Sequence, residues 1–156
     1  MVYAAVGTKC PSLVLVGPYF SISENDRVDE KISAKITFIN AVSDDQLKTL
    51  YQYAVALVFP SLYEGFGLPI LEAMSAGTPV ITSNISSMSE IADKAATLVD
   101  PYSEKEIAAA MLRIYKDREY SSKLRIKGLK HAHEFSWEKT ALQTIECYTS
   151  LLRNRP

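Results

Sequence analysis

Short apolar runs, rich in β-branched residues, alternate with amphipathic segments over the first two thirds of the chain. Parallel strands need long crossover connections, so this alternation is typical of a parallel sheet with helices on both faces. The predicted strands are residues 12–16, 35–39, 55–59, 79–82 and 96–99. Residues 55–59 are nearly all apolar, which predicts a strand that is buried on both faces. The sequence therefore predicts an α/β fold built on a parallel sheet.

Helix starts lie between the predicted strands. Three Ser residues are followed, three positions later, by Glu or Gln, a spacing that fits the capping box. These pairs are Ser43 with Gln46, Ser87 with Glu90, and Ser103 with Glu106. A short helix is predicted over 69–76, because Pro69 suits a first turn and Gly77 suits a helix end. Helical spacing without strand signals then predicts three consecutive helices, over 103–117, 119–134 and 137–153.

Length and charge narrow the classes of partner. The 156 residues correspond to one domain, and the formal net charge of −1 gives no general electrostatic reason to expect a nucleic-acid partner. A basic run on the second of the three helices fits a solvated face, so membrane contact is not indicated. That run comprises Lys123, Arg125, Lys127 and Lys130. His131 and His133 are two positions apart on the same helix, which predicts separate surface side chains instead of a shared metal.

The two cysteines indicate neither a metal nor a disulfide framework. Cys10 and Cys147 are far apart and have no neighbouring Cys or His at metal-ligand spacing, so reduced thiols are predicted. The first residues lack the basic start of a signal peptide, and Lys9 and Pro11 interrupt their apolar character. We therefore expect cytoplasmic residence. Residues 19–31 are polar, with charges of both signs, and predict a mobile surface loop.

The segment 60–74 carries the chemistry. It follows a predicted strand, contains Gly65 and Gly67, and opens the helix that begins near Pro69. Ligands of open α/β sheets bind at such strand ends. Glycines let backbone approach a ligand closely, and the free N–H groups of a helix start favour an anion. The segment therefore predicts a site for a phosphorylated ligand.

Two carboxylates, Glu64 and Glu72, frame this glycine loop and are eight positions apart. Each is suited to accept hydrogen bonds from adjacent sugar hydroxyls, and such a charge-assisted bond contributes about 1.5–3 kcal/mol. The loop must reverse if the two are to share a pocket. A simpler interpretation also stands: Glu72 complements the helix dipole in the first turn, and Glu64 is a solvated loop residue.

The region from residue 44 to residue 101 resembles the donor-binding half of the retaining GT-B glycosyltransferases called glycosyltransferase family 4. The family signature is a pair of glutamates separated by seven residues, as Glu64 and Glu72 are here. The matching segments are Glu64-Gly65-Phe66-Gly67-Leu68-Pro69, Glu72-Ala73-Met74, Gly77-Thr78-Pro79-Val80, Glu90 and Val99-Asp100-Pro101. The resemblance implies a Rossmann-like parallel sheet, the C-terminal half of a GT-B fold, that ends in consecutive helices.

The resemblance also implies roles for individual residues. Glu64 would lie beside the donor sugar as the catalytic-site glutamate, and Glu72 would hold the ribose hydroxyls. The loop at Gly65 would approach the donor, and backbone N–H groups matching three further residues would meet the sugar and phosphates. Those three residues are Phe66, Gly67 and Leu68. Backbone groups near Val42, in the loop 40–42, would line the nucleobase.

The implied reaction moves a sugar from a nucleoside diphosphate to an acceptor with retained anomeric configuration. No metal or other cofactor is implied, because basic side chains and helix N-termini neutralise the diphosphate. A glycine-arginine pair and a following lysine, which clamp the diphosphate in family members, are not found in this sequence, and Lys9 is no substitute. We therefore expect residues 1–156 to form one nucleotide-sugar-binding domain without its first strand, inactive alone.

Activity would need the N-terminal, acceptor-binding half of a GT-B enzyme, supplied in cis or in trans, and any contact with a membrane would come through that half. The last predicted helix would cross back toward it, leaving an apolar surface that needs a partner; the alternative is that this surface packs on the domain. The residues concerned are Trp137, Leu142, Ile145 and Tyr148.

Two other functions remain open from the sequence. One is a non-catalytic nucleotide-sugar-binding module. The other is a glycoside hydrolase with Glu64 and Glu72 as its pair of carboxylates, which would have to lie about 5–9.5 Å apart. Small departures from the family pattern occur at Met88-Ser89, in place of leucine-proline, and at Asp93-Lys94, in place of glycine-aspartate. Both are expected to affect a turn more than the donor pocket.

Overall fold

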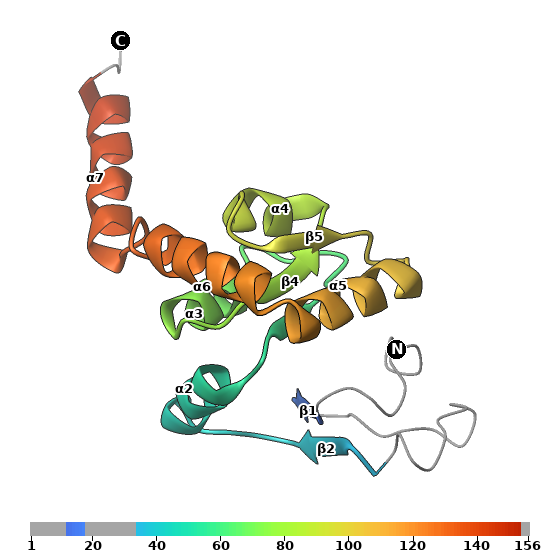
Figure 1. The fold of residues 1–156 in the computed structure, drawn as a ribbon. Coiled ribbons are helices and arrows are strands. Elements are labelled where there is room, and N and C mark those ends of the chain that lie inside the picture. The colour runs from blue at the N-terminus through green and yellow to red at the C-terminus, as the bar shows by residue number, and fades with distance from the viewer. Residues whose placement is uncertain (1–11, 18–33, 154–156) are drawn as a thin grey trace.

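The computed structural model describes residues 12–17 and 34–153, which form five strands and six helices (Figure 1). The chain order is β1 Leu13–Val16, β2 Ile36–Ile39, α2 Asp44–Tyr53, β3 Leu57–Phe59, α3 Leu68–Ser75, β4 Val80–Ser83, α4 Ser86–Ala92, β5 Thr97–Val99, α5 Glu104–Lys116, α6 Arg118–Ala132 and α7 Trp137–Arg153. All five predicted strands are confirmed, and so are the three consecutive helices at the end. Cys10, the segment before it and the predicted loop 19–31 lie outside the described residues.

The strands are parallel, as predicted, but they form two sheets. β1 pairs with β2, and β3, β4 and β5 pair in that order, with α2 lying between the two groups along the chain (Figure 1). The expectation that the strand at 55–59 is buried on both faces is wrong. β3 is only half-buried along its length, because it is an outer strand of its three-stranded sheet.

The core is organised around β4, whose four residues are all buried. Val80 packs with residues of α3 and α4, whereas the next residue, Ile81, packs with residues of β5, α5 and α6. Successive strand residues point to opposite faces of a sheet, so these two clusters lie on opposite faces. Helices therefore cover both faces of the three-stranded sheet, which confirms the predicted fold class.

The capping predictions have mixed outcomes. At α2 the box is complete: Ser43 Oγ accepts a hydrogen bond from the Gln46 N–H, and Gln46 Oε1 accepts one from the Ser43 N–H. At α5 Ser103 caps the Glu106 N–H, but the Glu106 carboxylate accepts from the Asp100 N–H instead. The predicted box at Ser87 is wrong, because α4 begins at Ser86 with Ile85 as its N-cap, so Ser87 lies inside the helix and no side chain caps the start.

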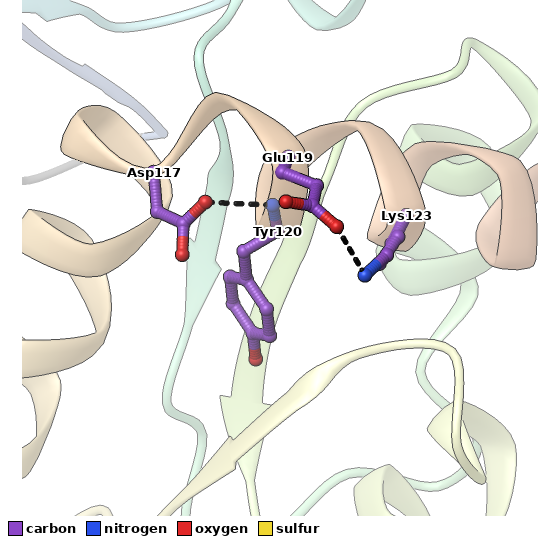
Figure 2. Close-up of polar contacts among 4 residues, drawn as sticks. All are labelled: Asp117, Glu119, Tyr120 and Lys123. Atoms are coloured by element: carbon purple, nitrogen blue, oxygen red, sulfur yellow. Dashed lines mark hydrogen bonds and ion pairs between the residues drawn. The ribbon is translucent and has the colours of Figure 1, made fainter.

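The junction between α5 and α6 is fixed by polar contacts (Figure 2). Asp117 Oδ1 accepts a hydrogen bond from the Tyr120 N–H at 2.9 Å, which starts α6 at Arg118, one residue before the predicted start. The Tyr120 hydroxyl and Thr97 Oγ1 lie 2.9 Å apart, which ties α6 to β5. The Arg113 guanidinium lies 3.7 Å from the centre of the Tyr120 ring, a cation–π contact.

The basic run on α6 is a solvated face, as predicted, because Lys123, Arg125, Lys127 and Lys130 are all exposed. Lys123 forms an exposed ion pair with Glu119 at 2.6 Å (Figure 2), which contributes no more than about 1 kcal/mol at such a surface position. Arg125 lies over Gly77, since a Cβ added to that glycine would come within 3.1 Å of Arg125 Nε. Gly77 has a φ of 77° and follows the end of α3, as predicted for a helix stop.

Helices α3 and α6 approach closely at a second point. Gly128 on α6 is buried, and a Cβ there would lie 3.1 Å from Met74 Cγ and 3.7 Å from Met74 Cα on α3. His131, on the same helix, is partly buried instead of being a surface residue as predicted, because its Nε2 lies 2.8 Å from the Ile91 carbonyl oxygen at the end of α4. His133 is exposed, as predicted.

Asp93 occupies a backbone conformation that suits glycine. It follows α4 with φ 41° and ψ −124°, and the Ala95 N–H donates to the Ala92 carbonyl across it. This is the geometry of a type II′ turn with Asp93 at its first central position, where glycine predominates. The departure from the family's glycine therefore leaves a strained turn.

We expect Asp93→Gly to raise the free energy of unfolding by about 1 kcal/mol, because relief of about 1–3 kcal/mol of backbone strain exceeds the entropy cost of a glycine. Thermal unfolding should show a midpoint higher by about 2–4 °C. Lys94→Gly is the matched control: φ at Lys94 is not positive, so the same replacement should lower the midpoint or leave it unchanged. Equal shifts of the unfolding midpoint in the two variants would contradict backbone strain at Asp93.

Helix α7 projects away from the body (Figure 1) and buries none of its residues. Trp137, Leu142, Ile145 and Tyr148 are each more than half exposed, so they do not pack on the domain. They recur at helical spacing with Leu152 and give α7 an uncovered apolar face. Among the described residues, no helix is both long enough and apolar enough to cross a lipid bilayer.

Candidate functional site

Glu64 is held in place by serine hydroxyls from neighbouring segments. It lies between β3 and α3 and is half-buried. The Ser61 hydroxyl donates to its carboxylate Oε1 at 2.8 Å, and the Ser87 hydroxyl of α4 donates to its backbone carbonyl oxygen, also at 2.8 Å. Ser83, buried at the end of β4, donates in turn to the Ser61 carbonyl. These contacts fix Glu64 to the carboxyl ends of β3 and β4.

The glycine loop after Glu64 offers unpaired backbone donors. Within the described part of the chain, the N–H groups of Gly65, Phe66 and Gly67 donate to no acceptor. A Cβ at Gly65 would meet no atom within 4 Å, so the backbone at Gly65 faces open space, whereas Gly67 is buried and a Cβ there would lie 3.3 Å from Ile70 Cδ1. Gly67 has a φ of 107° and sits immediately before α3. A run of free donors leading into a helix start is the arrangement that favours anionic or hydroxylated ligands.

Glu72 lies in the second turn of α3, where it is exposed, and α3 has no acidic residue in its first turn. The interpretation that Glu72 complements the dipole in the first turn is therefore wrong, because that effect decays within one turn. Its Oε2 instead accepts a hydrogen bond from the Tyr51 hydroxyl of α2 at 3.2 Å. Burial, together with the nearby Glu72 carboxylate, raises the pKa of Tyr51, so the phenol stays a donor at neutral pH.

The structure places the other predicted residues as follows. Phe66 and Leu68 are exposed at the start of α3, and Val42 is half-buried directly before the Ser43 cap of α2. Tyr51 lies in the last turn of α2, so Val42 precedes one end of that helix and Glu72 contacts the other. No hydrogen bond joins Glu64 to Glu72 among the described residues. The role of Val42 beside a nucleobase stays a prediction.

Sequence reasoning missed the residues that support the two glutamates. Tyr51 is 21 positions from Glu72, and Ser87 is 23 positions from Glu64, so local patterns give no sign of either pairing. The sequence predicts Ser87 as a cap, whereas in the structure its hydroxyl holds the Glu64 backbone. The sequence gives one related signal, the hydroxyl pair Thr82-Ser83, since hydroxyls near a core need acceptors; in the structure they donate to the Phe59 and Ser61 carbonyls.

Two other features do not belong to this site. A shallow surface hollow of about 780 Å³ lies where α5 meets α6, and none of its lining residues comes from the segment 60–74. It is lined by Ala109, Leu112, Arg113, Lys116, Asp117 and Arg118. No group of three or more metal-ligating side chains occurs in residues 12–17 and 34–153, and the expectation that the reaction uses no metal stays a prediction.

Comparison with known proteins identifies the family. The sequence profile described as "Glycosyl transferases group 1" matches residues 10–131. This chain belongs to the glycosyl transferases group 1 family. O-antigen chain mannosyltransferase B of Escherichia coli is 42% identical over 116 residues, which are 74% of this chain and 30% of that protein. O-antigen chain mannosyltransferase RfbU of Salmonella typhimurium is 45% identical over 87 residues, 56% of this chain and 25% of that protein.

Solved structures agree on the fold of this group 1 domain. Sucrose-phosphate synthase from Thermosynechococcus elongatus superposes with a TM-score of 0.78 at 29% identity, over 97% of this chain and 42% of that one. Anabaena Alr3699/HepE, solved with UDP-glucose, superposes with a TM-score of 0.77 at 21% identity, over 96% and 44%. The fold is that of a C-terminal GT-B domain, as the resemblance implied. The chain spans less than half the length of these relatives.

Proposed function

We propose that this chain is the donor-binding part of a retaining glycosyltransferase, a hexosyltransferase that moves a sugar from a nucleoside diphosphate to an acceptor. One observation carries the proposal: the loop 65–67, exposed at Gly65 and Phe66, has three consecutive free N–H groups between two anchored carboxylates, Glu64 and Glu72. Free N–H groups suit phosphate and sugar oxygens, and carboxylates suit adjacent sugar hydroxyls. Membership of the glycosyl transferases group 1 family supports the same assignment.

In this proposal the two glutamates bind different parts of the donor, Glu64 the sugar and Glu72 the ribose. Glu64 hydrogen-bonds the sugar with the carboxylate oxygen that Ser61 leaves free, and Ser87 keeps its backbone from moving. Glu72 accepts from the ribose hydroxyls, with Tyr51 holding one of its oxygens in place. Fixing a carboxylate before the ligand arrives lowers the ordering cost of binding. Gly65, Leu68 and the segment near Val42 complete the donor surface.

The chemistry assigned to this half is stabilisation of the leaving diphosphate. Donors that are already oriented toward developing negative charge are typically the largest electrostatic contribution to such catalysis. Here those donors are the N–H groups of Phe66 and Gly67 and the start of α3. We propose that they act together with basic side chains of the rest of the enzyme, without a metal.

The partner in this proposal is the N-terminal half of a GT-B enzyme, in cis or in trans. The chain corresponds to only 30% of O-antigen chain mannosyltransferase B, and α7 leaves its apolar face uncovered. Both facts support a domain that is inactive alone and gains activity when the other half is present. The exposed free thiol of Cys147 fits the reducing conditions of the cytoplasm, where we place the enzyme.

Ligand-observed NMR tests the donor site. The protein is mixed with UDP, GDP and ADP, and with their common sugar conjugates, because the method detects millimolar affinity. We expect a base-selective signal that identifies the nucleotide. Absence of any signal for all of these ligands would contradict donor binding by this chain. Hydrolysis of an aryl glycoside that is lost on changing either glutamate to Gln would instead establish the hydrolase alternative.

Glu64→Ala should weaken the nucleotide sugar about tenfold while leaving the bare nucleotide nearly unchanged, since it removes a charge-assisted hydrogen bond to the sugar. Dissociation constants from NMR titration of both ligands check this. Glu146→Ala, the same change at an exposed position on α7, is the control and should alter neither. An equal loss for both ligands would overturn the assignment of Glu64 to the sugar.

A further inference from the structure

The glycine loop carries one aromatic side chain, Phe66, and it contacts a segment far away in the sequence. The Phe66 ring lies edge-on to the ring of Phe135, with centroids 6.4 Å apart and planes at 78°. This is a favoured geometry for aromatic pairs, because the positive edge of one ring meets the negative face of the other. Phe135 lies in the short turn between α6 and α7, so two segments that are 69 positions apart meet at the site.

Phe135 is itself firmly positioned. Its N–H donates to the Ala132 carbonyl at the end of α6, and the next residue, Ser136, caps α7 by accepting from the Lys139 N–H. The ring of His131 packs edge-on against Phe135, with centroids 5.2 Å apart. His131 is anchored to the Ile91 carbonyl of α4 through Nε2 and lies 3.5 Å from a Glu134 carboxylate oxygen through Nδ1. The ring contacts Phe66–Phe135–His131 therefore link the glycine loop to α6, which is anchored to α4.

The glycine loop needs such support. Glu64 is tied down by Ser61 and Ser87, and Ile70 N–H donates to the Gly67 carbonyl at the start of α3. Between these anchors the backbone N–H groups are unpaired, and a Cβ at Gly65 would touch nothing. Two glycines flank Phe66 and give the backbone wide conformational freedom. Among the described residues, the contact of Phe66 with Phe135 is the ring contact that reaches the middle of this loop.

We propose that Phe135 is a positioning residue for the donor site: backed by His131, it holds Phe66 and so orients the free N–H groups of residues 65–67. The inference rests on the proposed function for its consequence, because those N–H groups are the ones assigned to the donor. Phe135 touches no substrate in this scheme. It also places the start of α7 directly behind the glycine loop, so a partner that covers α7 would act on the same turn.

Backbone dynamics of the ligand-free protein test the positioning itself. In Phe135→Ala, ¹⁵N relaxation should show the order parameters at Gly65, Phe66 and Gly67 falling from rigid values of about 0.85 toward about 0.6. Phe135→Tyr keeps the ring and should restore the rigid values. Trp137→Ala, which removes an exposed aromatic side chain two residues further on, is the control and should leave the loop unchanged. Rigid loop amides in Phe135→Ala would overturn the proposal.

Donor binding is the second measurement. Phe135→Ala should weaken the nucleotide sugar about two- to tenfold, the range expected for loss of an aromatic pair, and Phe135→Tyr should recover the affinity. A general loss of stability would not be rescued selectively in this way. A loosened loop in a protein that binds no nucleotide at all would refute the proposed function while supporting the positioning. A loosened loop with unchanged donor affinity would overturn the role in the donor site.

Discussion

Replacing Glu72 with alanine is expected to weaken nucleotide binding about 10- to 150-fold, which corresponds to the loss of about 1.5–3 kcal/mol for a hydrogen-bonded charge. The loss should be the same for the bare nucleotide and for its sugar conjugate, because the contact assigned to Glu72 is with the ribose that both contain. NMR or calorimetric titration of the two ligands measures it. Glu146→Ala on α7 provides the same chemical change at an exposed, distant position.

The fold should tolerate this change, so the effect can be separated from unfolding. Glu72 is exposed, and its hydrogen bond with Tyr51 is an exposed contact at 3.2 Å. Tyr51→Phe removes that bond while keeping the carboxylate, and should cost only a small part of the affinity. Wild-type affinity in Glu72→Ala would contradict the ribose assignment. A loss of affinity confined to the sugar conjugate would instead assign Glu72 to contact with the sugar.

Ile81→Ala should lower the free energy of unfolding by about 2–5 kcal/mol, because a fully buried branched side chain is removed from a core that cannot close around the gap. Ile81 is 0% exposed at the centre of β4 and packs with Val99, Ile107 and Ile114. Urea denaturation measures the change. Ile126→Ala is the matched control, since Ile126 is 68% exposed on α6 and Ala is the better helix former there. Similar losses at both positions would show that β4 does not organise the core.

Features that depend on nearby residues were predicted well from the sequence. The capping residue Ser43, the stop at Gly77 and the bounds of the last three helices all follow from interactions within one or two turns. The division into two sheets and the half-buried state of β3 were not predicted. Strand pairing joins distant segments, and the sequence of a short apolar run does not distinguish a central strand from an outer one.

In the candidate site, too, residues that are adjacent in the sequence were predicted and residues that are distant were not. The glycine loop and its two glutamates were found because a strand, two glycines and a helix start are adjacent in the sequence. Their supporting groups were not found, since Tyr51, Ser87 and Phe135 reach the site only through the fold. The strain at Asp93 was also missed: the departure from glycine was visible, but the turn type that makes it costly depends on the hydrogen bond across it.

The close approach of α3 and α6 limits how Glu72 can move. Gly128 packs directly against Met74, and the Arg125 side chain lies over Gly77, so α3 and α6 are in close contact at two points. Because close-packed interiors transmit strain, we expect the two helices to move together. Any domain closure that moves Glu72 is therefore expected to move α6 as well. Because the turn at Phe135 connects α6 to α7, the same motion would change the position of α7 relative to the rest of the enzyme.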